Sequence, residues 1–217
     1  MKADMKVEML DSAGGDLSIV NSARVSFNKE TEELEGKDEK LIRYLAKHKH
    51  MTPFRHNYIK VRCKVPVFLA RQLMKHQAGL SWNEVSRRYV DDGVEFYVPD
   101  EWRLRPDESI KQGSGEPLED DRYRALDHEY QRFLGDALQF FTTLVGKGKI
   151  APEMARMILP QSMMVDVIWT GNLLAFSHVY NLRAGEGAQK EAQDFAKLLS
   201  EVIAPEFPVG WEALTCE

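Results

Sequence analysis

The densest group of residues that could do chemistry lies in the run Arg71–Tyr89. Basic residues and a histidine end its helical part, a turn at Gly79 follows, and Ser86, Arg87 and Arg88 come next. Hydroxyl and guanidinium groups presented on such a loop can donate hydrogen bonds to a phosphate. The residues alone therefore predict an anion-binding loop, and the alternative is a helix end followed by a solvated loop.

Two arginines further along the chain favour the anion-binding interpretation. Arg156 lies in the apolar stretch ARMILP, and Arg183 ends the apolar segment NLLAFSHVYNLR. Either could instead form a buried ion pair or extend its head group to solvent. Asn172 and Arg183 are close to three helical turns apart, so they share a helix face with Phe176 and Val179. This face is predicted to lie against a flat ring system.

Other reactive residue types indicate less. The segment around His50 has no carboxylate or cysteine partner at metal-ligand spacing, so no metal is expected. Cys63 and Cys216 are far apart, form no disulfide framework, and Cys63 is interpreted as a small buried hydrophobic residue. Ser86 has no evident His-Asp pair to activate it, so it is predicted to bind rather than to attack.

The composition is that of one soluble globular domain over residues 1–217, expected in the cytoplasm. Hydrophobic residues make up 43% and charged residues 29%, and the formal net charge is -5. This charge gives the whole chain no bias toward nucleic acid or an anionic membrane, so neither is expected as a partner. Neither a signal peptide nor a membrane-spanning segment is expected, because the sequence has no apolar run of the kind that either requires.

Hydrophobic periodicity predicts an α+β fold, with a mainly antiparallel sheet packed by helices. The order of elements lacks regular βαβ alternation, and no GxGxxG follows a strand, which argues against a Rossmann site. Residues 100–117 are expected to form an irregular surface insert. Strands are expected at the start of residues 17–28 and at 57–64, 94–98 and 163–169. Helices are expected at 66–76, 38–48, about 119–145, 151–158, 172–183 and 188–204.

These residues resemble those of the flavin-dependent thymidylate synthase family. In that family Arg-His-Arg is followed by seven residues and then by the Ser of an Asn-Glu-x-Ser-x-Arg-Tyr block. This chain has Lys75-His76-Gln77, eight residues and then Ser86. Two arginines are thus replaced by Lys75 and Gln77, and one residue is inserted near Gly79 or Leu80. Four further segments are similar to family elements, namely Ala23–Phe27 (ARVSF), His50–His56 (HxTPFxH), Ala155–Pro160 (ARxxLP) and Asn181–Glu191 (NLR…AQxE).

The resemblance implies an enzyme that methylates dUMP to dTMP. Its implied carbon donor is 5,10-methylenetetrahydrofolate, and its implied hydride source is reduced FAD, recycled by NADPH. It also implies a homotetramer whose active sites combine residues of several subunits.

The resemblance also assigns roles by matching position. Arg183 is the expected catalytic residue, since a fixed positive charge beside the uracil would stabilise its anionic form. The residues expected to bind dUMP are Gln72, Lys75, Glu84, Ser86, Arg87, Arg88, Arg156 and Arg183. Those expected to bind FAD are Thr52, Lys75, His76, Gln77, Glu84, Asn172 and His178, of which His178 stands where the family often has Asn.

Three alternatives stay open from the sequence. One is another flavin- or nucleotide-binding enzyme on the same fold, and a second is a nucleic-acid-binding module using the basic loop. The overall acidity argues against the second. The third, a flavin-free thymidylate synthase, needs a catalytic cysteine, and neither Cys63 nor Cys216 lies among the arginines.

Overall fold

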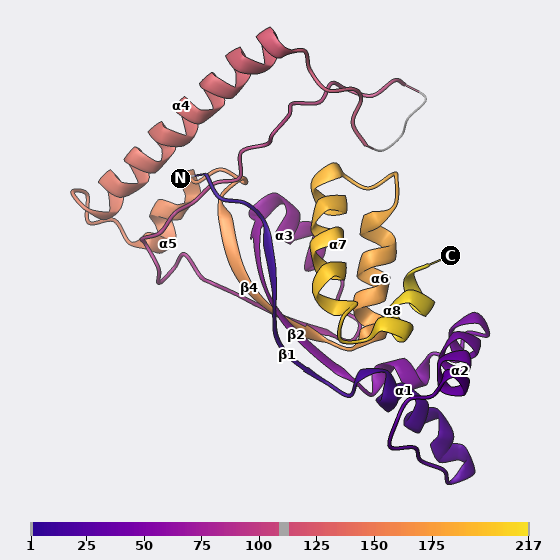
Figure 1. Cartoon of the computed structure of the whole chain (residues 1–217). Coiled ribbons are helices and arrows are strands. Elements are labelled where there is room, and N and C mark those ends of the chain that lie inside the picture. The colour runs from indigo at the N-terminus through magenta and orange to yellow at the C-terminus, as the bar shows by residue number, and fades with distance from the viewer. Residues whose placement is uncertain (1, 109–112, 217) are drawn as a thin grey trace. The chain divides into compact units, whose positions relative to one another are not determined.

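The structure is a computed structural model that describes residues 2–108 and 113–216. It has the predicted α+β class, with helices and an antiparallel sheet (Figure 1). The strands are β1 (Lys6–Ala13), β2 (Tyr58–Pro66), β3 (Leu80–Glu84) and β4 (Met164–Gly171). Their order in the sheet is β1-β2-β4-β3. Strands β2 and β4, which are far apart in the sequence, are therefore central.

Helices connect and cover these strands. The α-helices are α1 (Gly15–Arg24), α2 (Gly36–Lys47), α3 (Val67–Leu73), α4 (Asp120–Val145), α5 (Pro152–Ala155), α6 (Leu173–Ala184), α7 (Lys190–Ile203) and α8 (Pro208–Thr215). Short 3-10 helices are η1 (Val25–Phe27), η2 (Thr52–Arg55) and η3 (Arg156–Ile158). In the described part of the chain, no helix is both long enough and apolar enough to cross a membrane.

Contacts between residues group the chain into two compact units, to both of which β2 and β4 contribute. The first unit comprises Met1–Met5, Lys64–Gln72 and Glu84–Val167. The second unit comprises Lys6–Cys63, Leu73–Asn83 and Ile168–Glu217. The assignment of residues 1–217 to a single domain stays a prediction.

In the first unit, α4 supplies the main helical packing surface. Leu134, Ala137 and Phe141 are buried at spacings of three and four residues, which places them on one face of the helix. This helix packs against α5 and η3. On the sheet side, Phe96 is fully buried and forms isolated bridges to Lys2 and Met163. The long helix expected at about 119–145 is thus confirmed.

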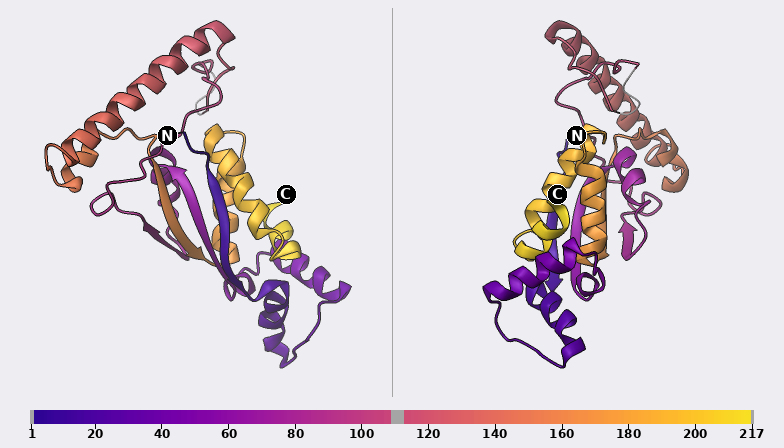
Figure 2. Two further views of the ribbon diagram at one scale, coloured as in Figure 1. Left: turned by 60° about the vertical axis from the view of Figure 1, so that its left-hand side comes forward. Right: turned by 90° about the vertical axis from the view of Figure 1, so that its right-hand side faces the viewer.

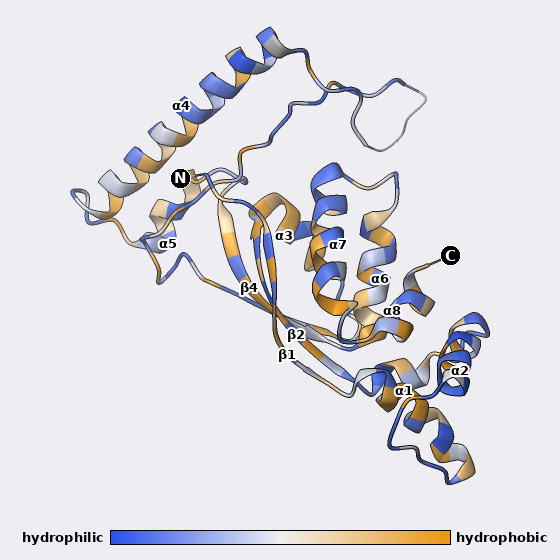
Figure 3. Ribbon diagram, in the orientation of Figure 1, coloured by the Kyte–Doolittle hydropathy of each residue, from blue (hydrophilic) through white to orange (hydrophobic). Residues whose placement is uncertain are grey.

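In the second unit, the core is centred on Trp169 of β4. Its ring meets Trp82 and Phe176 edge-on, each at 5.3 Å between centroids, and Phe195 lies at 6.4 Å. The helix α7 lies beside α6 and against β1 (Figures 1 and 2). Its hydrophobic and hydrophilic residues alternate at helical spacing (Figure 3). That amphipathic pattern explains why one face of α7 is buried.

The C-terminal helix α8 is attached to α1 by a buried carboxylate. Asp16 accepts hydrogen bonds from the backbone N–H groups of Val209 and Gly210, both at 2.8 Å. Helix N-termini leave such N–H groups without partners inside the helix, so a carboxylate there satisfies them. Burial raises the pKa of Asp16, although these two hydrogen bonds oppose the rise.

Three predicted elements differ in the structure. The strand expected from residue 17 is part of α1, whose buried Ile19 and Val20 face the core while Ser18 and Asn21 do not. Tertiary packing here overrides the β-propensity of a short apolar pair. The expected strand 94–98 buries alternate residues, yet only Phe96 forms ladder bridges, so it is an extended segment rather than a strand. The helix expected from Pro66 begins at Val67 and ends at Leu73.

Candidate functional site

The residues expected to bind ligands divide between the two units. Gln72, Glu84, Ser86, Arg87, Arg88 and Arg156 belong to the first unit. Thr52, Lys75, His76, Gln77, Asn172, His178 and Arg183 belong to the second. Most of the expected dUMP set is thus in the first unit, and most of the expected FAD set is in the second.

A cavity of about 240 Å³ lies in the first unit, where the loop after β3 meets the segment after α5. Small-molecule sites commonly measure about 300–1,000 Å³, so this cavity suits part of a nucleotide rather than the whole of it. Its lining includes Glu84, Ser86, Arg87 and Arg156, all of them expected site residues, and Gln161. Four expected residues are therefore brought together around one space.

The loop after β3 is shaped by its own backbone. The Val85 N–H donates to the carbonyl of Asp166 at 2.9 Å, which continues the pairing of β3 with β4. The Ser86 carbonyl then accepts from the N–H groups of Tyr89 and Val90, at 3.1 and 3.2 Å. The Ser86 hydroxyl oxygen accepts from the Arg88 N–H at 3.3 Å. The chain thus turns sharply at Ser86 and holds its hydroxyl in place.

Arg87 supports this loop from inside. Its guanidinium donates to the carbonyls of Asp92 and of Gly93, the latter at 3.1 Å, with a longer contact of 3.5 Å to Val90. The residue is buried, and burial lowers its pKa while Asp92 and two other acids oppose that change. Its donors therefore shape the loop, although it also lines the cavity.

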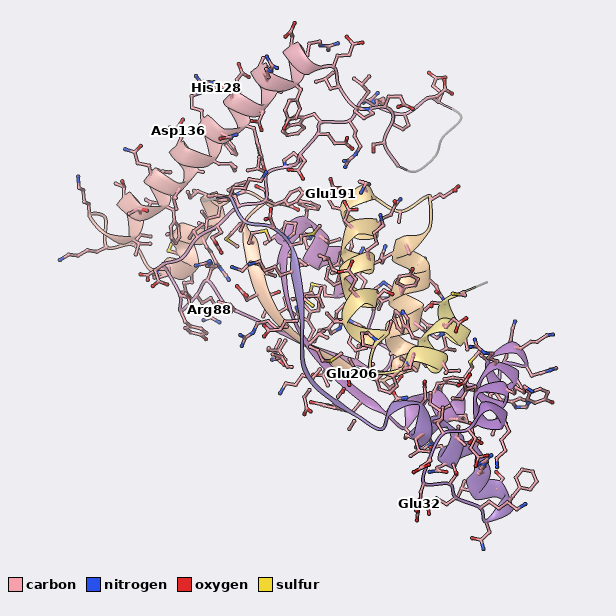
Figure 4. All side chains as sticks on the ribbon, viewed as in Figure 1. Glu32, Arg88, His128, Asp136, Glu191 and Glu206 are labelled. Atoms are coloured by element: carbon pink, nitrogen blue, oxygen red, sulfur yellow. The ribbon has the colours of Figure 1, made fainter. Side chains whose placement is uncertain are left out.

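Arg88 and Arg156 are both held by Glu153 of α5. Arg88 donates to Oε2 of Glu153 from Nε at 3.2 Å and forms an ion pair with it through Nη2 at 3.1 Å. Arg156 donates from Nε to the backbone carbonyl of Glu153 at 3.3 Å. Arg88 is about half exposed and is labelled on the loop after β3 in Figure 4. Neither Gln72 nor Arg88 lines the cavity itself.

In the second unit, Arg183 and His76 are in direct contact. The Nε–H of Arg183 donates to Nε2 of His76 at 3.1 Å. Burial lowers the pKa of His76, and the charges of Arg183 and His178 lower it further. Burial also lowers the pKa of Arg183, from an ordinary value so high that the guanidinium remains charged. A lowered imidazole pKa favours the neutral form, which is the form that can accept this hydrogen bond.

The loop carrying His76 is seated on the start of α6 through a glycine. Gly79 has φ +74, and a Cβ there would lie 3.1 Å from Nδ2 of Asn172 and 3.3 Å from Cβ of Ala175. Asn172 itself caps α6, because its Oδ1 accepts from the Ala175 N–H at 2.9 Å. A side chain at position 79 would therefore be crowded by α6 and would also hold an unfavourable backbone conformation.

The predicted flat-ring surface on α6 is wrong. Phe176 and Val179 are fully buried, and Phe176 packs against Trp169. A ligand ring cannot lie on side chains that the core already covers. The remaining residues expected to bind FAD are accessible, since Thr52, Lys75, Gln77 and His178 are exposed.

A larger cavity, of about 630 Å³, lies in the second unit beside α2. Its cations Arg24 and Lys37 are both paired, with the buried carboxylate of Asp38 and with Glu35 respectively. Lys29 and Glu30 on the same wall offset each other in formal charge. This cavity therefore offers less net charge to an anion than the arginine cluster does.

Sequence reasoning missed Glu153, Gln161 and the contact between His76 and Arg183. Glu153 precedes Arg156 by three residues, which is contact spacing in a helix, so that signal was available. The other two depend on tertiary contacts between segments far apart in the chain. Across residues 2–108 and 113–216, no group of three or more His, Cys, Asp or Glu side chains could hold a metal ion.

An α+β fold that gathers arginines around a small cavity defines a protein equipped to bind an anionic small molecule. The chain belongs to the family of thymidylate synthase complementing proteins, the flavin-dependent thymidylate synthases, whose family model matches residues 8–209. The resemblance seen in the sequence is thereby confirmed.

Individual relatives cover nearly the whole chain. The flavin-dependent thymidylate synthase of Kosmotoga olearia is 36% identical over 211 residues, covering 95% of this chain and 88% of the relative. That of one strain of Thermus thermophilus is 35% identical over 207 residues, covering 95% and 74%. A crystal structure of the UMP/dUMP methylase PolB from Streptomyces cacaoi bound with 5-Br dUMP matches with a TM-score of 0.85 and 32% identity, covering 99% of this chain and 96% of that one.

Proposed function

We propose that this protein is a flavin-dependent thymidylate synthase that converts dUMP to dTMP. The observation that carries the proposal is the cavity lined by Ser86 and Arg156 with Arg88 held beside it, in a chain of this family. Reduced FAD supplies the hydride, and 5,10-methylenetetrahydrofolate supplies the one-carbon unit. NADPH would be the source of the reducing equivalents, and we place the enzyme in the cytoplasm.

The phosphate of dUMP binds at the loop after β3. Ser86 contributes its hydroxyl and Arg88 its guanidinium, while Arg156 approaches from the segment after α5. Guanidinium donors suit a phosphate because they remain charged and present paired N–H groups. Arg87 holds the loop in shape, and Glu84, Gln72 and Lys75 complete the nucleotide contacts.

Arg183 acts on the uracil. Carbon C5 becomes nucleophilic when the N3–C4=O side of the ring is ionised, because part of the negative charge is then delocalised onto C5, and a fixed cation stabilises that anionic form. The contact between the Arg183 Nε and His76 supports this role, because it restrains the orientation of the guanidinium. No proton needs to leave Arg183, whose pKa stays far above neutral.

The residues of the second unit have the donor chemistry that FAD requires. Lys75 offers a positive charge and Gln77 an amide in place of the two arginines usual in the family, and Thr52 offers a hydroxyl. The close approach of Gly79 to α6 restrains the backbone of the loop that carries Lys75 and Gln77. These residues, with His76, Asn172, His178 and Glu84, would bind the cofactor and orient it.

The active form is a homotetramer with active sites shared between subunits. A cavity of about 240 Å³ is smaller than a dUMP, flavin and folate site must be, which supports sites completed by neighbouring copies.

A second candidate is methylation of UMP as well as dUMP. PolB is described as a UMP/dUMP methylase, and its structure bound with 5-Br UMP also matches this chain, with a TM-score of 0.84 and 30% identity. The two activities differ only in acceptance of the ribose 2′-hydroxyl. Release of tritium from C5-labelled UMP and from C5-labelled dUMP, compared at equal concentrations, separates them.

Flavin colour is the first test of the proposal. The purified protein should carry flavin absorbance that dUMP perturbs, and it should release tritium from C5-labelled dUMP when methylenetetrahydrofolate and NADPH are present. A protein that neither retains added FAD nor responds to dUMP would refute the proposed function.

A further inference from the structure

We propose that Glu153 is a positioning residue that orients Arg88 and Arg156 toward the phosphate of the substrate nucleotide. This inference rests on the proposed function and concerns the same site. Glu153 is not among the residues expected from the family motifs, and the structure brings it to the arginine cluster from the four-residue helix α5 (Pro152–Ala155).

The carboxylate of Glu153 fixes one edge of the Arg88 guanidinium. A single oxygen, Oε2, contacts both Nε at 3.2 Å and Nη2 at 3.1 Å. A guanidinium presents two such edges, one formed by Nε and Nη2 and the other by the two Nη groups. Occupation of the first edge leaves the second directed away from Glu153. An anion can therefore bind Arg88 while the carboxylate contact stays in place.

Arg88 is restrained from two further directions. Its Cζ lies over the ring of Tyr89, 5.6 Å from the ring centroid, which favours one plane for the guanidinium. Its backbone N–H donates to the Ser86 hydroxyl oxygen at 3.3 Å, which restrains the main chain from which the Arg88 side chain extends. Because Arg88 is already held by Glu153, by the ring of Tyr89 and through its backbone, it loses less conformational entropy when a ligand binds.

The main chain of Glu153 does the same for Arg156. The Arg156 Nε donates to the Glu153 carbonyl at 3.3 Å, which leaves its Nη groups for the cavity that Arg156 lines. Both arginines are thus held through Nε by one residue. Because Arg156 uses the backbone, substitution of the Glu153 side chain perturbs Arg88 and leaves the Arg156 contact intact.

A carboxylate beside a phosphate site could instead weaken binding by repulsion or by masking Arg88. Both partners of the pair are about half exposed, so solvent screens that repulsion. The phosphate would also contact the far edge of the guanidinium, with the width of that group between the two anions. Orientation therefore outweighs repulsion, and the two effects predict opposite changes in affinity.

The test compares wild type with Glu153→Gln and Glu153→Asp, using dUMP as the probe. Loss of a charged surface pair corresponds to roughly a two- to fivefold change in an equilibrium constant. Glu153→Gln should therefore raise the Kd and KM for dUMP about fivefold and leave kcat within about twofold. Glu153→Asp, which keeps the charge on a shorter side chain, should recover part of the loss. Circular dichroism checks that each variant is folded.

Two controls isolate the contact with Arg88. Asp100→Asn removes another exposed, ion-paired carboxylate of the first unit and should leave the KM for dUMP unchanged. In an Arg88→Gln background, Glu153→Gln should add no further loss, because its partner is already gone. A purely structural role for Glu153 would add the same loss in both backgrounds.

The outcomes separate this inference from the proposed function. Wild type that fails to bind dUMP at all refutes the proposed function. Wild type that binds dUMP, with Glu153→Gln binding it equally or more tightly, overturns the positioning role alone. A fall in kcat at unchanged KM would also overturn it, since the residue would then act on the chemical step.

Discussion

The Nε–H of Arg183 donates to Nε2 of His76 across 3.1 Å, which ties the end of α6 to the loop that precedes β3. Because Nε2 accepts, a neutral His76 must carry its proton on Nδ1. Protonation of Nε2 would replace this hydrogen bond with two adjacent cations. The orientation of Arg183 therefore depends on His76 being neutral, and its lowered pKa keeps it so at neutral pH.

A pH profile tests this dependence. The pKa of His76 is lowered, so the acceptor form persists at neutral pH and is lost only as pH falls below the ordinary histidine value of about 6.5. Tritium release from labelled dUMP should show a decline in kcat/KM on that acid side. His76→Gln keeps an acceptor oxygen that does not titrate, so this decline should flatten. An unchanged acid limb would contradict the assignment, and His128→Gln on the exposed surface of α4 is the matched control (Figure 4).

Removal of the Arg183 guanidinium should abolish most of the chemistry without unfolding the protein. Loss of one preorganised charge-stabilising group typically costs about 10²–10³ in kcat, so Arg183→Ala should lose at least that much dTMP formation. Arg183→Lys should recover little, since it keeps the charge and loses the Nε donor to His76. Full activity of Arg183→Ala in the tritium-release assay would exclude the role. Arg43→Ala removes an arginine paired at the surface with Glu212 and serves as the control.

Much of the fold follows from periodicity in the sequence. The apolar spacing within α4 and α7 places one face of each helix in a core, and the alternation in β2 buries Ile59, Val61 and Cys63. Burial raises the pKa of the Cys63 thiol to about 12, which fits its prediction as an inert core residue. These patterns of apolar residues predict the elements correctly because tertiary packing buries the same residues.

Other elements could not be predicted from the sequence of the segment alone. Strand β1 shows an exposed and half-buried pattern whose partners lie about 50 residues away, and β3 is a polar segment paired with β4. The contact of Arg183 with His76 joins residues 107 positions apart. Pairings of this kind depend on the whole fold, so motif matching located the residues and left their partners unknown.

Gly79 should be intolerant of a side chain. In Gly79→Ala the methyl group would meet Asn172 at 3.1 Å and occupy a left-handed conformation that costs about 1–2 kcal/mol. Gly15 has a similar φ of +55 but an ordinary nearest contact of 3.7 Å, so Gly15→Ala measures the conformational cost alone. Urea unfolding should show the larger loss for Gly79→Ala, and FAD titration should show weaker binding for that variant only. Equal FAD affinity in both variants would argue against this loop as part of the flavin site.

The carboxylate of Asp16 should increase the free energy of unfolding, because it accepts hydrogen bonds from the start of α8. Asp16→Asn keeps one acceptor oxygen for two N–H donors, those of Val209 and Gly210, and turns an amide N–H₂ toward the other. A buried donor without a partner costs about 1–3 kcal/mol, so unfolding in urea should shift by that amount. Glu206→Gln at the exposed contact with Ser12 should change it by less than about 0.5 kcal/mol. A loss no greater than that of Glu206→Gln would show that the buried contact adds no stability.

Arg87 and Arg88 are adjacent, yet they should respond oppositely to substitution. Arg87→Gln leaves the carbonyls of the exposed residues Asp92 and Gly93 without their charged donor, and because water can partly replace it, this should cost about 1–2 kcal/mol. Arg87→Lys should rescue little, because an ammonium lacks the planar fork that bridges separate carbonyls. Arg88→Gln, at the exposed pair with Glu153, should leave the free energy of unfolding within about 0.5 kcal/mol and raise the KM for dUMP.

Hydrogen exchange distinguishes these two roles directly. In Arg87→Gln the amides of residues 86–93 should exchange faster than in wild type, because the turn at Ser86 loses the guanidinium that closes it from within. The KM for dUMP should rise as a consequence, since the Ser86 hydroxyl is then held less firmly. In Arg88→Gln the same amides should exchange at the wild-type rate while the KM still rises. Equal exchange in all three proteins would mean that the backbone turn alone shapes the loop, and Arg87 would then be free to contact the substrate.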